Sequence, residues 1–354
     1  MRTSTRISLG LSVLLLVCCR PSGLINDADV KLVRPEKQSE IQAELFFPAD
    51  TSAVVQFIDL QIVSDTVLVV RVQPGVGDDR MFRAYSTRSG VFLGAFLHEG
   101  RGPGEMLNPH MAKTHSGFDC LCMNENATGQ AFLINVLESI SDQQTSYAGR
   151  FCLPDQTLDW LPLPGMEQFC LSIKSGVVNY LTTSSEGAVR LAVNPFKNSG
   201  EQYVTQLSGL FTCNEATGVI IECLQFFPQI VFFDTHTGEL RSIAVSRDYQ
   251  KWESLLDGWT SAEAVMKSIQ YYAGVCSSSE YIFATYAGIS LTEMQQSGHG
   301  VQIHVFGWSG EFVCSLRVSE DLGMLTYDER NQQLYGLDRI RGKIFRYDLS
   351  ELLP

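Results

Sequence analysis

Short apolar runs separated by polar turns make up most of the chain after residue 54. Two such runs, 54–63 and 67–72, are joined by the polar turn Ser64-Asp65-Thr66. Runs bounded by turn residues in this way are typical of β-strands in hairpins. Both runs are apolar at most positions, as strands are when other sheets cover both faces of their sheet. The pattern therefore predicts an all-β core of packed sheets.

A hairpin signature recurs along the chain. Residues 82–95, 231–245 and 304–318 each contain an apolar run, a short polar turn ending in Gly and a second apolar run. Repeated hairpins of this kind predict a β-propeller, in which each blade is a small antiparallel sheet. The turn glycines Gly238 and Gly310 are 72 positions apart, whereas a blade takes roughly 40–50 residues. An insertion between them is therefore expected.

The insertion carries the signals of a short helix near 261–273. Residues 260–263 read Thr-Ser-Ala-Glu, a capping box in which Glu263 can return the hydrogen bond of the N-cap. Apolar residues follow at helical spacing at Val265, Ile269 and Tyr272, and Gly274 ends the pattern. We expect this helix to pack on the propeller.

The middle of the chain is less regular than its end. Residues 130–140 fit either a short helix or a strand, and 155–165 reads as a Pro-rich loop carrying Trp160. Further strands are expected at 177–183, 189–193, 324–327, 334–337 and 344–349.

The first residues read as a targeting signal. Arg2 and Arg6 form a basic start, and residues 7–17 form an apolar run too short to span a bilayer in the mature protein. The run ends in Cys18-Cys19, which resembles a bacterial lipobox. Cys19 is then the lipidated residue, with Cys18 as the alternative anchor, and an ordinary cleaved signal is the third option. We therefore expect a signal peptide over 1–18, a tether over 19–40 and the propeller over 41–354.

Composition and charge narrow the functional classes. The 354 residues are 45% hydrophobic and 18% charged, a composition that suits a globular protein with a large core. The formal net charge is −13 and the pI is near 4.9. A chain with this acidic charge lacks the basic surface that binds nucleic acids and anionic lipids. We expect a monomer that does not bind nucleic acid and that reaches the membrane only through its lipid anchor.

One loop has a specialised backbone, 98–105, which reads His-Glu-Gly-Arg-Gly-Pro-Gly-Glu. Glycine permits positive φ, whereas Pro103 fixes its own φ and restricts the residue before it, so neither a strand nor an ordinary helix can continue here. Two interpretations stay open. The loop is a structural corner in which Glu105 bonds loop amides, or an anion-binding nest. The nest would be formed by Gly100, Arg101, Gly102, Gly104 and Glu105. No Lys-Ser/Thr pair follows, so this is not a phosphate loop.

Other residues give weaker signals of chemistry. Asp65-Thr66-Val67 resembles the O-glycosylation site of Bacteroidota, with Thr66 as acceptor, and it also fits a plain hairpin turn. We expect His98, His110 and His115 to be surface loop residues rather than metal ligands. The sequence contains neither a G-x-S-x-G elbow nor H-E-x-x-H. We therefore expect no catalytic residue, no metal and no cofactor.

Eight cysteines lie outside the lipobox: Cys120, Cys122, Cys152, Cys170, Cys213, Cys223, Cys276 and Cys314. They can be buried free thiols, or they can include one or two disulfides such as Cys152–Cys170 or Cys213–Cys223.

Two segments resemble a known family. Residues 98–106, HEGRGPGEM, are similar to the G-x-G-P-G-E segment of the TolB-like six-bladed β-propeller lipoproteins of Bacteroidota. Residues 326–353 resemble the final blade of that family. The middle of the chain diverges from it, since Asn124 stands after the expected strand 118–123, where the family would have an Asp. The resemblance implies six blades, closed by an N-terminal strand near 54–60 that pairs into the last blade.

These observations favour a lipid-anchored propeller of the cell envelope, placed at the outer membrane, that acts as a non-catalytic binding module. Its partner would be an envelope protein or glycan, because propeller ends offer wide surfaces lined by loops. The alternatives are a hydrolase or lyase acting on envelope glycans or peptides at the central channel, and a purely structural envelope component.

Overall fold

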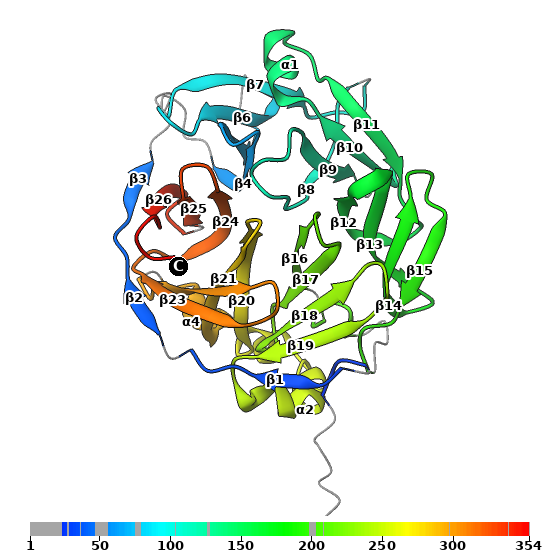
Figure 1. The fold of residues 1–354 in the computed structure, drawn as a ribbon, viewed down its shortest axis with the longest axis vertical. Helices are drawn as coiled ribbons and strands as arrows, with labels where there is room; N and C mark the ends of the chain where they lie inside the picture. Colours follow the sequence, from blue (N-terminus) through cyan, green and yellow to red (C-terminus); the bar gives the residue numbers. More distant parts are fainter. Residues whose placement is uncertain are drawn as a thin grey trace, which may run out of the picture.

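The computed structural model describes residues 23–26, 28–35, 37–46, 56–74, 79–102, 104–125, 128–197, 203–207, 209–296, 298–338 and 340–353. These residues form six mainly antiparallel sheets arranged around a central channel, each sheet being one blade (Figure 1). The fold is therefore a six-bladed β-propeller, as the recurring hairpins and the family resemblance predicted.

Blades 1 to 5 each take four consecutive strands of the chain, with the first strand innermost, and blade 6 takes three. Blade 1 consists of β4 (Phe57–Val63), β5 (Val67–Val72), β6 (Arg80–Ser86) and β7 (Phe92–His98). Blade 2 consists of β8 (His110–Met111), β9 (Leu121–Glu125), β10 (Gln130–Ile134) and β11 (Tyr147–Cys152). Blade 3 consists of β12 (Thr157–Leu163), β13 (Glu167–Lys174), β14 (Val177–Ser184) and β15 (Val189–Val193).

The second half of the ring repeats this order. Blade 4 consists of β16 (Gly209–Asn214), β17 (Val219–Leu224), β18 (Gln229–Asp234) and β19 (Leu240–Ala244). Blade 5 consists of β20 (Ile269–Ser277), β21 (Tyr281–Ser290), β22 (Val301–Gly307) and β23 (Phe312–Val318). Blade 6 contains β24 (Leu322–Asp328), β25 (Gln333–Asp338) and β26 (Lys343–Asp348). We call the face where the innermost strands begin the upper face. Connections between blades, and those between second and third strands, start and end there.

The N-terminal segment closes the ring from outside. It supplies β3 (Glu44–Phe46), which pairs antiparallel with β26 as the fourth strand of blade 6. Two further short strands, β1 (Val30–Leu32) and β2 (Gln38–Glu40), pair parallel with β19 and β23. Figure 1 shows this blue segment running around the outside of blades 4, 5 and 6. The closing strand predicted near 54–60 is therefore wrong, because residues from 57 onward form β4, the innermost strand of blade 1.

Part of the range predicted as a tether is built into the propeller. In addition to β1 and β2, Leu24 and Ile25 are completely buried. The backbone N–H of Asn26 donates to the carbonyl of Pro195 at 2.9 Å. This packing has no clear signal in the sequence, because β1 and β2 are only three residues long and half exposed. The proposed anchors Cys18 and Cys19 lie outside the described residues.

The predicted insertion is present, but its helices are shorter than expected. It contains η3 (Arg247–Lys251), α2 (Trp252–Leu256) and α3 (Ala262–Met266). The N-cap of α3 is Ser261, whose hydroxyl accepts from the backbone of Ala264 at 3.1 Å. The helix does not continue to 273, because residues from Ile269 onward pair with β21 as strand β20. Gly274 is a strand residue, and a Cβ there would lie 2.3 Å from the carbonyl oxygen of Gly323.

The ambiguous middle of the chain combines both structures that its pattern allowed. Residues 130–140 contain β10 followed by α1 (Val136–Ser141). The predicted Pro-rich loop at 155–165 is instead mostly β12, followed by the short η1 (Pro164–Met166). Pro162 is tolerated because β12 is an edge strand of its sheet. Trp160 is fully buried, and its Nε1 donates to Gln168 Oε1 at 2.7 Å.

Apolar side chains fill the spaces between neighbouring blades. The largest cluster joins blades 3 and 4, where the rings of Phe169 and Phe233 lie 5.4 and 5.3 Å from that of Tyr180. Such ring pairs contribute about 1 kcal/mol each beyond their buried area. The eight cysteines outside the lipobox are free thiols, most of them buried, so neither suggested disulfide is present. Burial raises the pKa of the Cys170 thiol to about 12.

Candidate functional site

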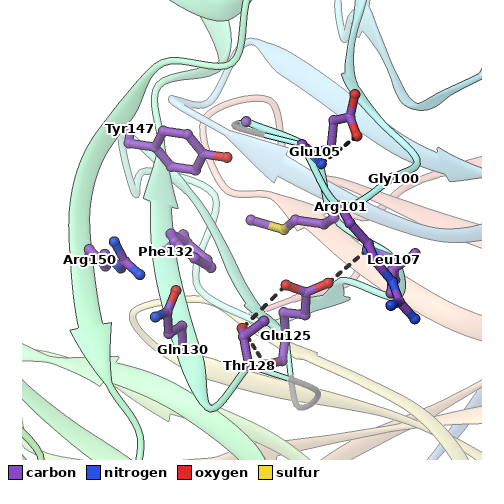
Figure 2. A pocket seen from close by; sticks show the side chains of 13 residues that line it. Gly100, Arg101, Glu105, Leu107, Glu125, Thr128, Gln130, Phe132, Tyr147 and Arg150 are labelled. Atoms are coloured by element: carbon purple, nitrogen blue, oxygen red, sulfur yellow. Dashed lines mark hydrogen bonds between the residues drawn. The ribbon is translucent and has the colours of Figure 1, made fainter.

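A groove lies on the rim between blades 1 and 2, with a volume of about 780 Å³ (Figure 2). One side is the connection between β7 and β8, and the other is formed by β10 and β11. We call it the rim groove. Its lining residues include Arg101, Glu105, Glu125, Gln130, Phe132, Tyr147 and Arg150.

The glycine loop of the rim groove is closed on itself. The carboxylate of Glu105 accepts a hydrogen bond from the backbone of Gly102, with 2.7 Å between N and Oε2. A Cβ on Gly100 would lie only 1.9 Å from Glu105 Oε2, so a larger residue there would push the Glu105 carboxylate away from the Gly102 amide. Gly104 has φ +82°, which favours glycine for its backbone. An external anion would therefore have to displace a carboxylate that already holds a loop amide.

The floor of the groove is a buried acid whose two oxygens both have partners. Glu125 Oε1 accepts from the backbone of Leu107 at 2.7 Å, and Oε2 accepts from the hydroxyl of Thr128 at 3.2 Å. Glu125 is 6% exposed. These bonds tie the β9–β10 connection to the β7–β8 connection, so the floor serves to hold the two sides together.

The opposite wall presents aromatic rings and a cation. The rings of Phe132 and Tyr147 lie 5.3 Å apart, and the guanidinium of Arg150 lies over the ring of Phe132 at 5.8 Å from its centre. Tyr147 is 41% exposed, so part of its ring is open to a ligand. Burial raises the pKa of Tyr147, and the charge of Glu125 raises it further, so the phenol remains a neutral hydrogen-bond donor.

The chemistry of the rim groove suits binding. Figure 2 shows Tyr147, Phe132 and Arg150 on one side and Arg101 on the other. Exposed aromatic rings accept the apolar face of a sugar or of a side chain, and guanidinium groups bind carboxylates or phosphates. The one buried acid of the groove, Glu125, is used for structure.

A second charged group occupies the upper mouth of the central channel. Asp59 and Asp159 lie near the start of β4 and β12, where the ladder shifts register, and each accepts from the next backbone N–H at 2.8 Å. Lys113, which follows β8, forms an ion pair with Asp59 and donates to the carbonyl of Leu60 at 2.7 Å. Blades 1, 2 and 3 thus contribute one residue each to this channel-mouth cluster of Asp59, Lys113 and Asp159.

Burial perturbs the acid of blade 3. Loss of solvation raises the pKa of Asp159 to about 6, whereas the Trp160 N–H and the charge of Lys113 oppose the rise. Next to this cluster, Arg71 donates to Asn108 at 2.9 Å. Desolvation and the charge of Arg71 lower the pKa of His110. The cluster therefore joins a neutralisable acid to a cation, a pair that could in principle serve proton transfer.

The lower mouth carries another acid–base contact. His115 Nε2 lies 3.5 Å from Glu215 Oε2, and Glu329 accepts from the backbone of Ser279 at 3.2 Å. Desolvation raises the pKa of Glu215, while His115 lowers it and Glu329 raises it further. Within the described ranges, no three His, Cys, Asp or Glu side chains are grouped as a metal site.

The structure places the predicted residues in different settings. Gly100, Arg101, Gly102, Gly104 and Glu105 all line the rim groove. Thr66 is exposed in the β4–β5 turn, and its glycosylation stays a prediction. His98 is exposed and lies 2.7 Å from Asp79, while His115 is half-buried.

The groove residues of blade 2 were not predicted. Phe132, Tyr147 and Arg150 belong to strands β10 and β11 and have no motif spacing relative to the glycine loop. Asp59 and Asp159 also gave no signal, because 100 positions separate them in the chain. The loop was detectable only through its glycines.

Six sheets around one channel define the class of protein, a six-bladed β-propeller. No family model and no curated protein matches the sequence. Among solved structures, a protein of Bacteroides fragilis described as exported has a TM-score of 0.56 and 12% identity, covering 90% of this chain and 98% of that one. A member of the DUF4221 family from Bacteroides vulgatus has a TM-score of 0.59 and 11% identity, covering 88% and 98%. At such low identities the similarity shows the fold.

Proposed function

We propose that this protein is a lipid-anchored β-propeller of the bacterial cell envelope that binds its ligand in the rim groove without catalysing a reaction. The observation that carries the proposal is the wall of the groove, where exposed Tyr147 lies beside Phe132 and Arg150. Arg101 lies on the glycine loop, on the other side of the groove (Figure 2). The rings and the guanidinium of Arg150 on one wall suit a ligand with a flat apolar face and an anionic edge.

The ligand class that fits best is an envelope glycan carrying acidic groups. A sugar ring stacks its C–H face on Tyr147, and its carboxylate or phosphate binds the guanidinium groups. Gln130 and Thr128 add an amide and a hydroxyl to the lining. An acidic segment of an envelope protein offers the same groups and is the second ligand to be tested.

The location rests on the first residues of the chain. The lipobox-like Cys18-Cys19 follows a basic start and an apolar run, which supports export and lipidation. The Bacteroides fragilis neighbour is described as exported, and the resemblance to TolB-like lipoproteins points the same way. Among the helices of the described part of the chain, none is long and apolar enough to cross a membrane. We place the anchor on Cys19 and the protein at the outer membrane.

The test is direct binding of defined envelope glycans. Calorimetry with soluble peptidoglycan fragments and with acidic lipopolysaccharide oligosaccharides should detect binding to the wild-type protein. The double substitution Tyr147→Ala and Arg150→Ala should weaken it at least about tenfold, since an aromatic and a charged contact are lost together. Arg88→Ala, at an exposed site in the β6–β7 turn, is the matched control. Equal binding by all three proteins would reject the rim groove as the site.

The anchor has its own test. Replacing Cys19 by Ala should release the protein from the membrane fraction. If membrane association persists, the anchor is Cys18 or is absent.

One observation favours a second function, an enzyme acting on envelope glycans or peptides at the channel. The channel-mouth cluster combines Asp159, with its raised pKa, and the ion pair of Lys113 with Asp59. Asp159→Asn should then abolish turnover of an envelope polysaccharide while leaving glycan binding in the rim groove intact. Absence of turnover by the wild-type protein on the same substrates would remove this alternative.

A further inference from the structure

The described fold begins very close to the proposed anchor. Gly23 is only four positions after Cys19, and Leu24 and Ile25 are already fully buried. The backbone N–H of Lys197 donates to the carbonyl of Leu24 at 2.8 Å, so this segment is fixed to the connection between blades 3 and 4. Four extended residues span at most about 14 Å. A lipid on Cys19 would therefore hold this side of the propeller next to the bilayer.

The inserted helices lie beside this point. Trp252 and Leu256 of α2 belong to the same core cluster as Leu24 and Ile25. From the end of α2, six residue steps lead to the start of α3, a distance of at most about 21 Å. Helix α3 therefore lies close to the segment with which the described fold starts.

Helix α3 is joined to α4 (Leu291–Met294), which follows β21 directly. The backbone N–H of Leu291 donates to the carbonyl of Ser268 at 3.1 Å, and the hydroxyl of Thr292 donates to the carbonyl of Met266 at 2.8 Å. Both helices adjoin strand ends on the upper face. They form one ledge there, between the inserted segment and blade 6.

This ledge exposes an apolar patch. A small cavity of about 260 Å³ is lined mainly by apolar residues, including those of α3, α4, β21 and the β25–β26 turn, and has Gln270, Gln295 and Asp321 as its polar members. Ile269 and Ile340 beside it are 40% and 44% exposed. We define the insertion patch as Met266, Ile269, Ile289, Leu291, Met294 and Ile340. The flanking charge of α3 is balanced, because Lys267 pairs with Glu263 at 2.6 Å.

We propose that the insertion patch rests on the lipid bilayer that holds the anchor. The inference relies on lipidation of Cys19, which belongs to the proposed function, and adds a defined orientation to it. Contact would be apolar, with isoleucine, leucine and methionine side chains entering the boundary between headgroups and acyl chains. It does not require attraction between charges, so the acidic net charge of the protein does not oppose it on a zwitterionic surface.

Hydrogen exchange on the lipidated full-length protein tests this orientation. The lipidated protein in phosphatidylcholine vesicles is compared with the Cys19→Ala protein, which carries no lipid, free in solution. Amides of α3, α4 and the β25–β26 turn should exchange severalfold more slowly in vesicles. Unchanged exchange there, or new protection only on another face, would overturn the proposal.

Substitutions then separate contact from anchoring. Ile269→Lys together with Ile340→Lys should abolish the protection that depends on vesicles, while lipidation and membrane association persist. Val91→Lys, at an exposed apolar site in the β6–β7 turn on the opposite face, should change neither. If the patch is protected equally without vesicles and the protein sediments as a dimer, a second copy covers it and the proposal fails.

The two proposals fail in different ways. Loss of membrane association in the wild-type protein would reject the anchor and, with it, the orientation. Retained anchoring with an unprotected patch rejects the orientation alone. Glycan binding in the rim groove is measured on separate residues and is unaffected by either result.

Discussion

The rim groove and the channel-mouth cluster both gather charged residues, yet they use them differently. At the channel mouth, Lys113 and Asp59 are paired, and their side chains are only 12% and 16% exposed. In the rim groove, Arg101 and Arg150 are exposed, and the ion pairs found among the described residues include neither of them. Charges that satisfy each other hold blades together, whereas exposed charges beside an aromatic wall are available to a ligand.

Because of this difference, we regard the channel-mouth cluster as structural and the rim groove as the region for binding. Removing a charge from the channel mouth should damage folding, and removing one from the rim groove should damage binding. Four experiments test that division.

The largest effect is expected from Lys113→Met. The substitution leaves the mostly buried carboxylate of Asp59 without its cation and removes the hydrogen bond to the carbonyl of Leu60. Loss of one partner of a buried ion pair should lower the free energy of unfolding by about 2–3 kcal/mol. Urea unfolding followed by tryptophan fluorescence measures it. The added substitution Asp59→Asn should recover part of the loss, and a variant as stable as the wild type would contradict the structural role.

Arg150→Met should have the opposite profile. The guanidinium is exposed and lies over Phe132, so the free energy of unfolding should change by less than about 0.5 kcal/mol. Affinity for an acidic envelope glycan should fall several-fold, because the methionine keeps much of the length of the side chain but removes its charge. On the same preparation, calorimetry measures the affinity and urea unfolding measures the free energy of unfolding. A stability loss equal to that of Lys113→Met would contradict the proposed difference between the rim groove and the channel-mouth cluster.

The pH dependence of stability should identify Asp159. Its pKa is raised from 3.8 to about 6 in the folded protein, so the folded state keeps a proton that the unfolded state releases in this window. Stability should therefore fall as the pH rises from about 4 to 6, by on the order of 1 kcal/mol per unit at most. Asp159→Asn should remove that slope, as measured by urea unfolding at several pH values. An unchanged slope would assign the dependence to other groups.

A small loss of stability is expected from a change in the glycine loop. Glu105→Ala removes the acceptor for the Gly102 N–H, which stands at the exposed edge of the loop and can turn to water. The free energy of unfolding should fall by about 0.5–1 kcal/mol. If the emptied loop then binds sulfate, seen by calorimetry in the variant and not in the wild type, Glu105 acts as a built-in anion.

The sequence predicted much of the fold, since the signals it used are local. The turn glycines Gly90, Gly238 and Gly310 have φ of 67°, 78° and 82°, the left-handed conformation that the hairpin signature required. The strands of all three hairpins are present. An inserted helix was also predicted, although its N-cap is Ser261 instead of Thr260 and its length was overestimated. A short segment rich in apolar residues can form either one face of a helix or a buried strand. Its sequence pattern alone does not distinguish the two.

The candidate site was detected only in part. The glycine loop of the rim groove was predicted from its glycines and proline, because these residues have unusual backbone conformations. Its partners Tyr147 and Arg150 are ordinary strand residues some 45 positions away, and no spacing rule connects the two segments. The closing strand was misplaced for a related reason. Glu44–Phe46 is short and half exposed, while 54–63 is longer and more apolar and therefore looked like the better candidate.

The sequence by itself determined the hairpins and turns, because each depends on neighbours within a few residues, and the acidic charge of the chain, because that depends on composition alone. The tertiary structure alone decided which strand closes the ring, which acids meet Lys113, and what faces the glycine loop. Those contacts join segments from tens to hundreds of residues apart. They are selected by the packing of six sheets around one channel, and no local propensity encodes that selection.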